Sequence, residues 1–138
     1  MRITARVDYA ILAVFELALH AKDRRMQARE LAEQQQIPLR FLEQILIQLK
    51  KAGLVESARG SSGGYMLAQQ PDQISLAEII TAVEGEVTLI DSRVNPGSVL
   101  CEVWKEIGQS LVTNLEAISV QDLIRRKIQQ EQVIVYHI

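Results

Sequence analysis

Apolar residues recur at helical spacing through the early part of the chain and predict three successive helices. The stretch 4–21 is apolar on nearly every side, which is typical of a helix buried on several faces, and Thr4 suits its N-cap. A short helix is expected over 26–34. A third is expected from Pro38, which a first helical turn tolerates, to about Ala52. Its inner face consists of apolar residues three and four positions apart: Leu42, Ile45, Leu46 and Leu49.

The spacing of apolar residues changes after Gly53, which is suited to end the third helix. Residues 54–58 and 65–68 each fit a short strand. Residues 59–64 between them are rich in turn formers. The pattern therefore predicts a β-hairpin with a glycine-rich tip.

A capping box follows the hairpin, because Glu78 stands three positions after Ser75. It predicts a fourth helix over 76–84, and Gly85 is suited to close this helix. Residues 86–97 show no clean period and contain a Pro-Gly pair, so we expect a connecting loop there.

A long amphipathic helix is predicted over 98–118, with a length of about 30 Å. Its apolar stripe needs a partner surface, because an isolated helix gains little stability from its own backbone. The stripe includes Leu100, Trp104, Ile107, Leu111 and Leu115. A short helix over 120–127 is expected next, and the tail at 133–136 is β-prone.

Helix, short helix, turn, helix and glycine-tipped hairpin follow one another in the order of a winged helix-turn-helix. The predicted fold class is therefore mainly α with a small β-hairpin wing, followed by a long helix. We expect a DNA-binding domain over 1–85 and a connecting loop over 86–97. The long helix and the C-terminal tail would occupy 98–138.

Composition supports a globular chain, since 48% of its 138 residues are hydrophobic and 23% are charged. The net charge of −2 excludes a polycation that binds nucleic acid by bulk charge. The charge is divided unevenly, however, at +3 over residues 1–70 and −5 over residues 71–138. This division suggests a mildly basic front and an acidic back. The first apolar run is too short to cross a bilayer, and we expect a cytoplasmic protein.

Polar side chains on the outer face of the third helix suit the reading of duplex DNA in the major groove. Arginine pairs with guanine, glutamine with adenine, and glutamate with the amino group of cytosine. The residues on this face are Arg40, Glu43, Gln44, Gln48 and Lys51. Lys50, Lys51, Arg24 and Arg25 are better placed for phosphates. At the hairpin tip, Arg59 can reach the backbone or the minor groove.

The sequence offers no chemistry for an enzyme. It shows no pair of nucleophile and base, no metal-ligand spacing, and no glycine-rich loop ahead of a helix. Gly63 and Gly64 fall within the predicted hairpin, which is the wrong context for a phosphate-binding loop. Cys101 is the one cysteine, so an intrachain disulfide is excluded.

Three stretches of this chain resemble the Rrf2 family of bacterial winged-helix transcription regulators. They read MRITARVDYAILAVFELA, ELAEQQQIPLRFLEQILIQLKKAGLVESARGSSGGYMLA and ISLAEIITAVEG. The resemblance covers about residues 1–118 and is most specific over Ile37–Leu67. It implies a homodimer that binds an imperfect palindrome in duplex DNA. It also implies that the long helix within 98–138 is a dimerisation helix and that the loop at 86–97 stands at the position of a sensor.

The resemblance also implies roles for individual residues. Arg40, Glu43 and Gln44 would read bases, and Phe41 would lie near the DNA backbone. Arg59 would enter the minor groove. Gly63 and Gly64 would allow the tight turn of the wing, where a positive φ is expected.

The sequence departs from the resemblance where iron–sulfur relatives carry three cysteines and then a histidine. Aligned on Trp104, Ser98 falls on the last of these cysteines and Cys101 on the histidine. Thiolates normally hold such clusters, so the standard ligand set is excluded. Asp8 matches a position that some relatives use as a ligand from the other subunit.

We therefore expect no cofactor, with Cys101 as a small apolar residue of the dimer helix. Two alternatives stay open at this point. One is an iron–sulfur or redox sensor with an atypical ligand set built from Cys101 and Asp8. The other is a module that binds another protein through the long helix.

Overall fold

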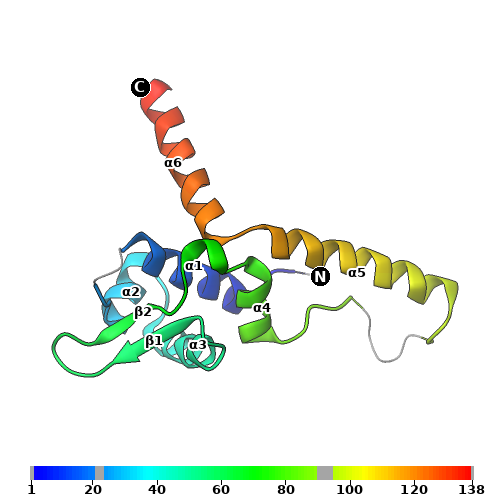
Figure 1. Ribbon diagram of the computed structural model, residues 1–138, viewed down its shortest axis with the longest axis horizontal. Helices are drawn as coiled ribbons and strands as arrows, with labels where there is room; N and C mark the ends of the chain where they lie inside the picture. Colours follow the sequence, from blue (N-terminus) through cyan, green and yellow to red (C-terminus); the bar gives the residue numbers. More distant parts are fainter. Residues whose placement is uncertain (1, 21–23, 90–94, 138) are drawn as a thin grey trace.

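The computed structural model describes residues 2–20, 24–89 and 95–137. It places six α-helices, one short 3-10 helix and a two-stranded antiparallel sheet in these residues (Figure 1). The elements follow in the order α1 (Ala5–Leu19), α2 (Ala28–Gln35), α3 (Leu39–Lys51), β1 (Val55–Ala58), β2 (Gly64–Leu67), η1 (Pro71–Gln73), α4 (Leu76–Glu84), α5 (Val99–Ala117) and α6 (Val120–His137). The expected fold class, mainly α with a hairpin wing, is confirmed.

Helix α1 lies at the centre of the body and packs against α2, α3, α4 and α6. Its central position agrees with its sequence, because Ala10, Ala13 and Val14 are fully buried. The Thr4 side chain accepts a hydrogen bond of 3.2 Å from the backbone N–H of Val7 and caps the helix as expected. The helix ends at Leu19, so Ala21 of the expected span lies outside the described residues.

The inner face of α3 is buried as its spacing predicted, since Leu42, Ile45, Leu46 and Leu49 have no exposed surface. Each such leucine or isoleucine stabilises the fold by about 1.5–3 kcal/mol relative to an exposed position. Four of them on one face fix the orientation of α3 against the body. The opposite face of α3 is therefore turned outward.

The strands of the hairpin pair from Val55 with Leu67 to Ala58 with Gly64. Met26 extends this sheet by one position, because its backbone N–H and C=O each bond to Tyr65, at 2.8 and 2.7 Å. The segment that leads into α2 is thus joined to the second strand. The wing consequently forms one unit with the helix-turn-helix.

The C-terminal region differs from the sequence-based expectation. The predicted short helix over 120–127 and β-prone tail at 133–136 are replaced by one helix, α6, which continues to His137. Helix-forming Gln and Glu residues at 129–132 carry the helix beyond Lys127, and local helical continuity overrides the strand preference of the valines that follow. Figure 1 shows α6 projecting away from the body.

Helix α5 extends along one side of the molecule, beyond α4 (Figure 1). Its end is joined to the body by backbone hydrogen bonds on both sides of Ser119. Leu76 N–H donates to the carbonyl of Ile118 at 2.9 Å, and Val120 N–H donates to the carbonyl of Ile74 at 2.9 Å. No helix in the described part of the chain is long and apolar enough to span a membrane.

Candidate nucleic-acid interface

The turn between α2 and α3 has the geometry of a helix-turn-helix. Gln36 ends α2 with φ of 55° and ψ of 44°, which is the left-handed conformation. The backbone N–H of Ile37 then donates to the carbonyl of Ala32 at 2.9 Å, and the Ile37 side chain is buried. Pro38 follows as the N-cap residue of α3. The chain therefore reverses sharply and presents α3 at the surface.

The outer face of α3 displays the residues that the sequence assigned to base reading. Arg40, Glu43 and Gln44 are all exposed, and Lys51 is exposed at the last turn. Because the other face is fully buried, these side chains stand on a rigid helix. Such a helix is suited to the major groove, which admits an α-helix and displays a distinct donor and acceptor pattern for each base pair.

Phe41 lies on the same surface but is also anchored to α1. Its ring meets the ring of Tyr9 edge-on, with centroids 5.8 Å apart. The side chain is still 42% exposed. The contact with Tyr9 gives Phe41 a structural role that the sequence alone did not show.

Gln48 and Lys50 sit differently from the other polar residues of α3. Gln48 is half-buried, and its Oε1 atom is buried with no hydrogen-bond partner. The Lys50 Nζ atom donates a hydrogen bond of 2.7 Å to Ser57 Oγ on β1. The sequence assigned Lys50 to phosphates, whereas in the structure its side chain links α3 to the wing.

The tip of the wing places Arg59 in an exposed loop between the two strands. Gly63 and Gly64 behind it are buried. The positive φ expected at both is found at Gly64 but not at Gly63, where a Cβ atom would instead clash with the backbone carbonyl oxygen of Ala58. Gly64 has φ of 122°, and a Cβ atom there would lie 2.5 Å from the carbonyl oxygen of Met26. The side-chain amide of Gln27 donates to the carbonyl of Gly63 at 3.0 Å and fixes the same turn from α2.

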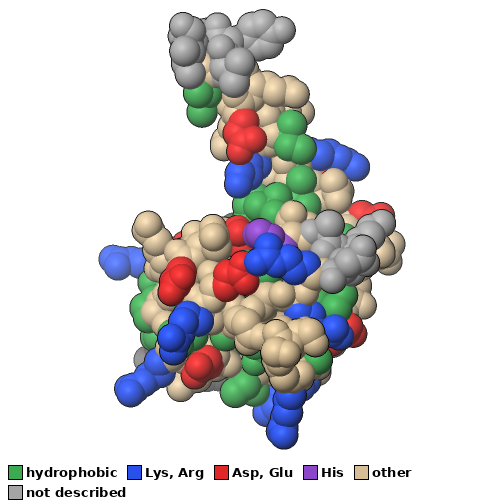
Figure 2. All heavy atoms as spheres, turned by 90° about the vertical axis from the view of Figure 1, so that its left-hand side faces the viewer, with side chains coloured by type: hydrophobic (Ala, Val, Ile, Leu, Met, Phe, Trp, Pro, Cys, Tyr) green, Lys and Arg blue, Asp and Glu red, His purple; other side chains and the backbone are tan. Residues whose placement is uncertain are grey.

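Basic residues before α2 are held by carboxylates. Arg24 forms an ion pair with Glu30, and an Arg25 amino nitrogen lies 3.7 Å from a carboxylate oxygen of Glu56 on β1. Figure 2, which faces the side of the hairpin, shows Lys and Arg side chains projecting from the lower edge with Asp and Glu between them. The face is therefore of mixed charge with a basic edge.

Helix α5 exposes most of the apolar stripe that the sequence predicted. Leu100 is 59% exposed, Ile107 is 45% exposed, and Trp104 and Leu111 are each 38% exposed. Leu115 is half-buried against the core. Large apolar side chains exposed in one row mark a surface that another molecule covers.

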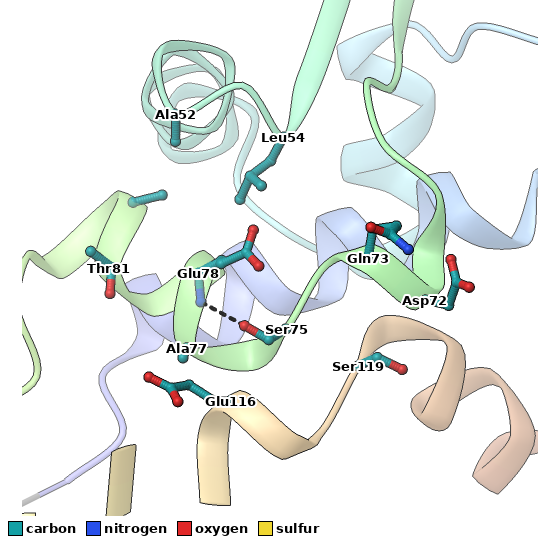
Figure 3. A pocket seen from close by; sticks show the side chains of 11 residues that line it. Ala52, Leu54, Asp72, Gln73, Ser75, Ala77, Glu78, Thr81, Glu116 and Ser119 are labelled. Carbon is teal, nitrogen blue, oxygen red and sulfur yellow. Dashed lines mark hydrogen bonds between the residues drawn. The ribbon is translucent and has the colours of Figure 1, made fainter. Parts of the chain in front are cut away.

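An open hollow of about 710 Å³ lies where α3, α4 and α5 approach one another (Figure 3). Ala52 at the end of α3, Thr81 of α4 and Glu116 of α5 contribute to its walls. Inside it, Ser75 Oγ accepts the backbone N–H of Glu78 at 3.2 Å, so Ser75 is the N-cap of α4 as the sequence predicted. This hollow is thus the place where the DNA-binding part meets the long helix.

The two residues of the atypical sensor alternative, Cys101 and Asp8, lie on different helices. Cys101 is 2% exposed, and its backbone N–H donates to Ser98 Oγ at 3.1 Å in the first turn of α5. Asp8 is exposed on α1. Among the described residues no three or more His, Cys, Asp or Glu side chains gather in a group that could hold a metal ion.

The structure contains a helix-turn-helix whose second helix has an exposed polar face, and a hairpin wing is fixed to the same unit. These features define a winged-helix DNA-binding protein. The model of the Rrf2 family, described as "Iron-dependent Transcriptional regulator", matches residues 3–126. The chain belongs to the Rrf2 family and is a DNA-binding transcription regulator. Its relatives are regulators and not enzymes, in agreement with the sequence analysis.

Two curated relatives illustrate the family. A protein of Synechocystis sp. named as an HTH-type transcriptional regulator is 37% identical over 128 residues, which are 89% of this chain and 87% of that protein. The HTH-type transcriptional regulator IscR of Xenorhabdus nematophila is 32% identical over 92% of this chain and 81% of its own length.

Solved structures show the same architecture. T. potens IscR superposes with a TM-score of 0.77 at 31% identity, over 92% of this chain and 88% of the other. CymR, described as the global cysteine regulator of B. subtilis, superposes with a TM-score of 0.79 at 27% identity, over 89% of this chain and 95% of the other. Both matches extend well beyond the DNA-binding part.

The donor set of this chain does not fit an iron–sulfur cluster. Clusters are held by several thiolates, whereas Cys101 is the one cysteine of the sequence and its side chain is buried in α5. An exposed carboxylate at Asp8 adds one weak donor. The iron dependence in the family description therefore has no matching ligand set here.

Proposed function

We propose that this regulator acts as a homodimer that reads a palindromic site in duplex DNA. One observation carries the proposal: α3 has a fully buried apolar face and an exposed polar face with the donors and acceptors that base edges require. In this account residues 1–85 bind DNA, and residues 98–138 form the dimer. Residues 86–97 connect these two parts. The protein acts in the cytoplasm.

The roles on α3 follow from side-chain chemistry. Arg40 donates to guanine, Gln44 pairs with adenine, and Glu43 accepts from the amino group of cytosine. Phe41 packs near the sugar-phosphate backbone, where its contact with Tyr9 holds the ring in place. The remaining polar positions, Gln48 and Lys51, lie farther along the helix and contact the edge of the site and a phosphate.

The wing supplies contacts outside the major groove. Arg59 extends from the exposed loop and inserts into the minor groove, where a narrow groove strengthens the negative potential. Gly63 and Gly64 contribute by the shape of the turn. Hydrogen bonds to Met26 and Gln27 anchor the returning strand of the wing to the helix-turn-helix.

The dimer is formed by the apolar stripe of α5. Leu100, Trp104, Ile107 and Leu111 are exposed in one row, and a second copy of the same stripe is the simplest surface that buries them. A two-fold dimer places two recognition helices on one face of the DNA. Their sites are then about 34 Å apart, one turn of the duplex.

Sensing in this account does not depend on a thiolate-held cluster. Cys101 serves as a buried apolar residue at the start of α5. Asp8 acts as a first-turn carboxylate that the dipole of α1 favours.

A selection experiment tests the proposal. The purified full chain is offered a pool of random-sequence duplexes at moderate salt, and the bound fraction is sequenced over several rounds. We expect one palindromic motif with half-sites one helical turn apart. Recovery of no motif, or of a motif without two-fold symmetry, contradicts the proposal. A chain that binds no DNA and copurifies with another protein at fixed stoichiometry would point to an interaction module.

A further inference from the structure

Glu16 is a buried carboxylate at the contact between α1 and α2. Its residue is 7% exposed, and it is the one charged side chain in the buried class of the described residues. It interrupts the apolar run of α1. Burying a charge is costly unless polar partners compensate it, so its presence there requires a reason.

Both oxygens of this carboxylate have partners. The Gln35 side-chain amide donates a hydrogen bond of 2.7 Å to Oε2, and His20 Nε2 lies within hydrogen-bond distance of Oε1, at 3.0 Å. His20 is the C-cap residue of α1, and Gln35 is the last residue of α2. Glu16 therefore joins the end of the core helix to the end of the first helix of the motif.

The hydrogen bond between Glu16 and Gln35 matters for α3 because Gln35 directly precedes the turn that leads to α3. Gln36, the next residue, is in the left-handed conformation, and Pro38 is the N-cap residue of α3. The apolar face of α3 resists separation from the body, but apolar packing has little directional preference. Hydrogen bonds to a fixed carboxylate are directional and charge-assisted. The hydrogen bond from Gln35 to Glu16 consequently fixes the end of α2, from which the turn to α3 begins.

We propose that Glu16, acting through Gln35, is the positioning residue that sets the recognition helix at the angle needed for sequence-specific binding. This inference rests on the proposed reading of DNA by α3. It predicts that disturbing the pair lowers the preference for the correct site more than it lowers binding to DNA in general. A residue that only stabilised the fold would lower both alike, because the folded fraction multiplies every affinity equally.

The test uses an exchange of the two side chains. Gln35→Glu places two carboxylates against each other, whereas the double variant E16Q/Q35E restores a donor and an acceptor with the charge moved across. The probes are the duplex selected by the wild-type chain and a shuffled duplex of the same composition. We expect Gln35→Glu to lower the ratio of the two affinities about tenfold and the double variant to recover it.

Two further variants keep the test decisive. Gln35→Ala removes the donor without adding charge and is expected to lower the ratio in the same direction. Gln34→Ala alters an exposed glutamine of the same helix and is expected to leave the ratio unchanged. The inference is overturned if both Gln35 variants retain the wild-type ratio, if Gln34→Ala lowers it equally, or if a folded double variant does not recover it.

An NMR measurement separates this inference from the proposed function. Backbone amide shifts of residues 39–42 should change in Gln35→Glu and return in the double variant, with no DNA present. Unchanged shifts overturn the positioning role even if the wild-type chain selects a palindrome. If the shifts respond but the wild-type chain prefers no duplex, the proposed reading of DNA fails, and the link from Glu16 to specificity fails with it.

Discussion

The ring of Phe41 on α3 meets the ring of Tyr9 on α1 edge-on, with centroids 5.8 Å apart and planes inclined by 80°. A pair of this geometry contributes about 0.5–1.5 kcal/mol beyond the area that it buries. One partner belongs to the core helix and the other to the surface proposed to face DNA. A substitution at this pair is therefore expected to affect both the stability of the fold and the proposed contact with DNA.

Phe41→Ala should lower the free energy of unfolding by about 1–2 kcal/mol, because it removes the ring contact and part of the apolar burial. Tyr9→Phe retains the ring and should change the stability little. Urea titration followed by circular dichroism measures both. Equal stability of Phe41→Ala and the wild type would show that the contact is not stabilising.

Gln36→Gly should stabilise the protein. Gln36 adopts φ of 55°, and an L-residue with a side chain incurs about 1–2 kcal/mol in this conformation. Part of this gain is lost because glycine is more flexible in the unfolded chain, so a net increase of about 0.5–1 kcal/mol in the free energy of unfolding is expected.

Gln34→Gly is the matched control for this substitution, since it alters an exposed neighbour inside α2. It should destabilise by about 0.5–1 kcal/mol, the ordinary effect of glycine in a helix. The same direction of change for both variants would contradict the assigned geometry of the turn.

Leu111→Glu should convert the proposed dimer into a monomer, because it places a charge in the middle of the exposed stripe of α5. The variant should remain folded, since the side chain is 38% exposed in the single chain. Thr113→Glu on the same helix, also at an exposed position, should leave the dimer intact. Sedimentation velocity decides between these results, and a dimeric Leu111→Glu protein would exclude the stripe as the interface.

The start of α6 should weaken in acid. Hydrogen bonds from the backbone and side chain of Ser119 lower the pKa of Asp122 below its ordinary value of about 3.9. The ionised carboxylate therefore stabilises the folded form. Its contribution is complete above the ordinary pKa and is lost as the pH falls through the lowered one.

Amide exchange in the first turn of α6 measures this effect. Protection at residues 119–123 should decline below about pH 4 in the wild-type chain. In Asp122→Asn the protection should be lower at neutral pH and should not depend on pH in this range. A wild-type decline that persists in the variant would assign it to another group.

The DNA-binding part could be predicted from the sequence in considerable detail. The face of α3 follows directly from its apolar spacing, and the hairpin follows from its turn residues, because these signals are local. The predicted length of α6 was wrong. The valines near its end favour strands, but the structure continues the helix through them.

Pairwise contacts across the fold were not predictable in the same way. The bond between Lys50 and Ser57 joins residues whose proximity depends on the final packing. Glu16 did leave a signal, as an acid within an apolar helix, but its partner Gln35 lies in a different helix. Spacing along the chain carries no information on such a pair.

The central claim is that the outer face of α3 reads bases, and the base preference of Gln44→Ala tests it most directly. Each base pair of the selected duplex is substituted in turn, and the affinities of Gln44→Ala and the wild type are compared by fluorescence anisotropy. Gln129→Ala, an exposed glutamine on α6, serves as the control. The account predicts that Gln44→Ala loses about 1–3 kcal/mol of discrimination at one position in each half-site and keeps it elsewhere. A profile identical to that of the wild type would contradict the account.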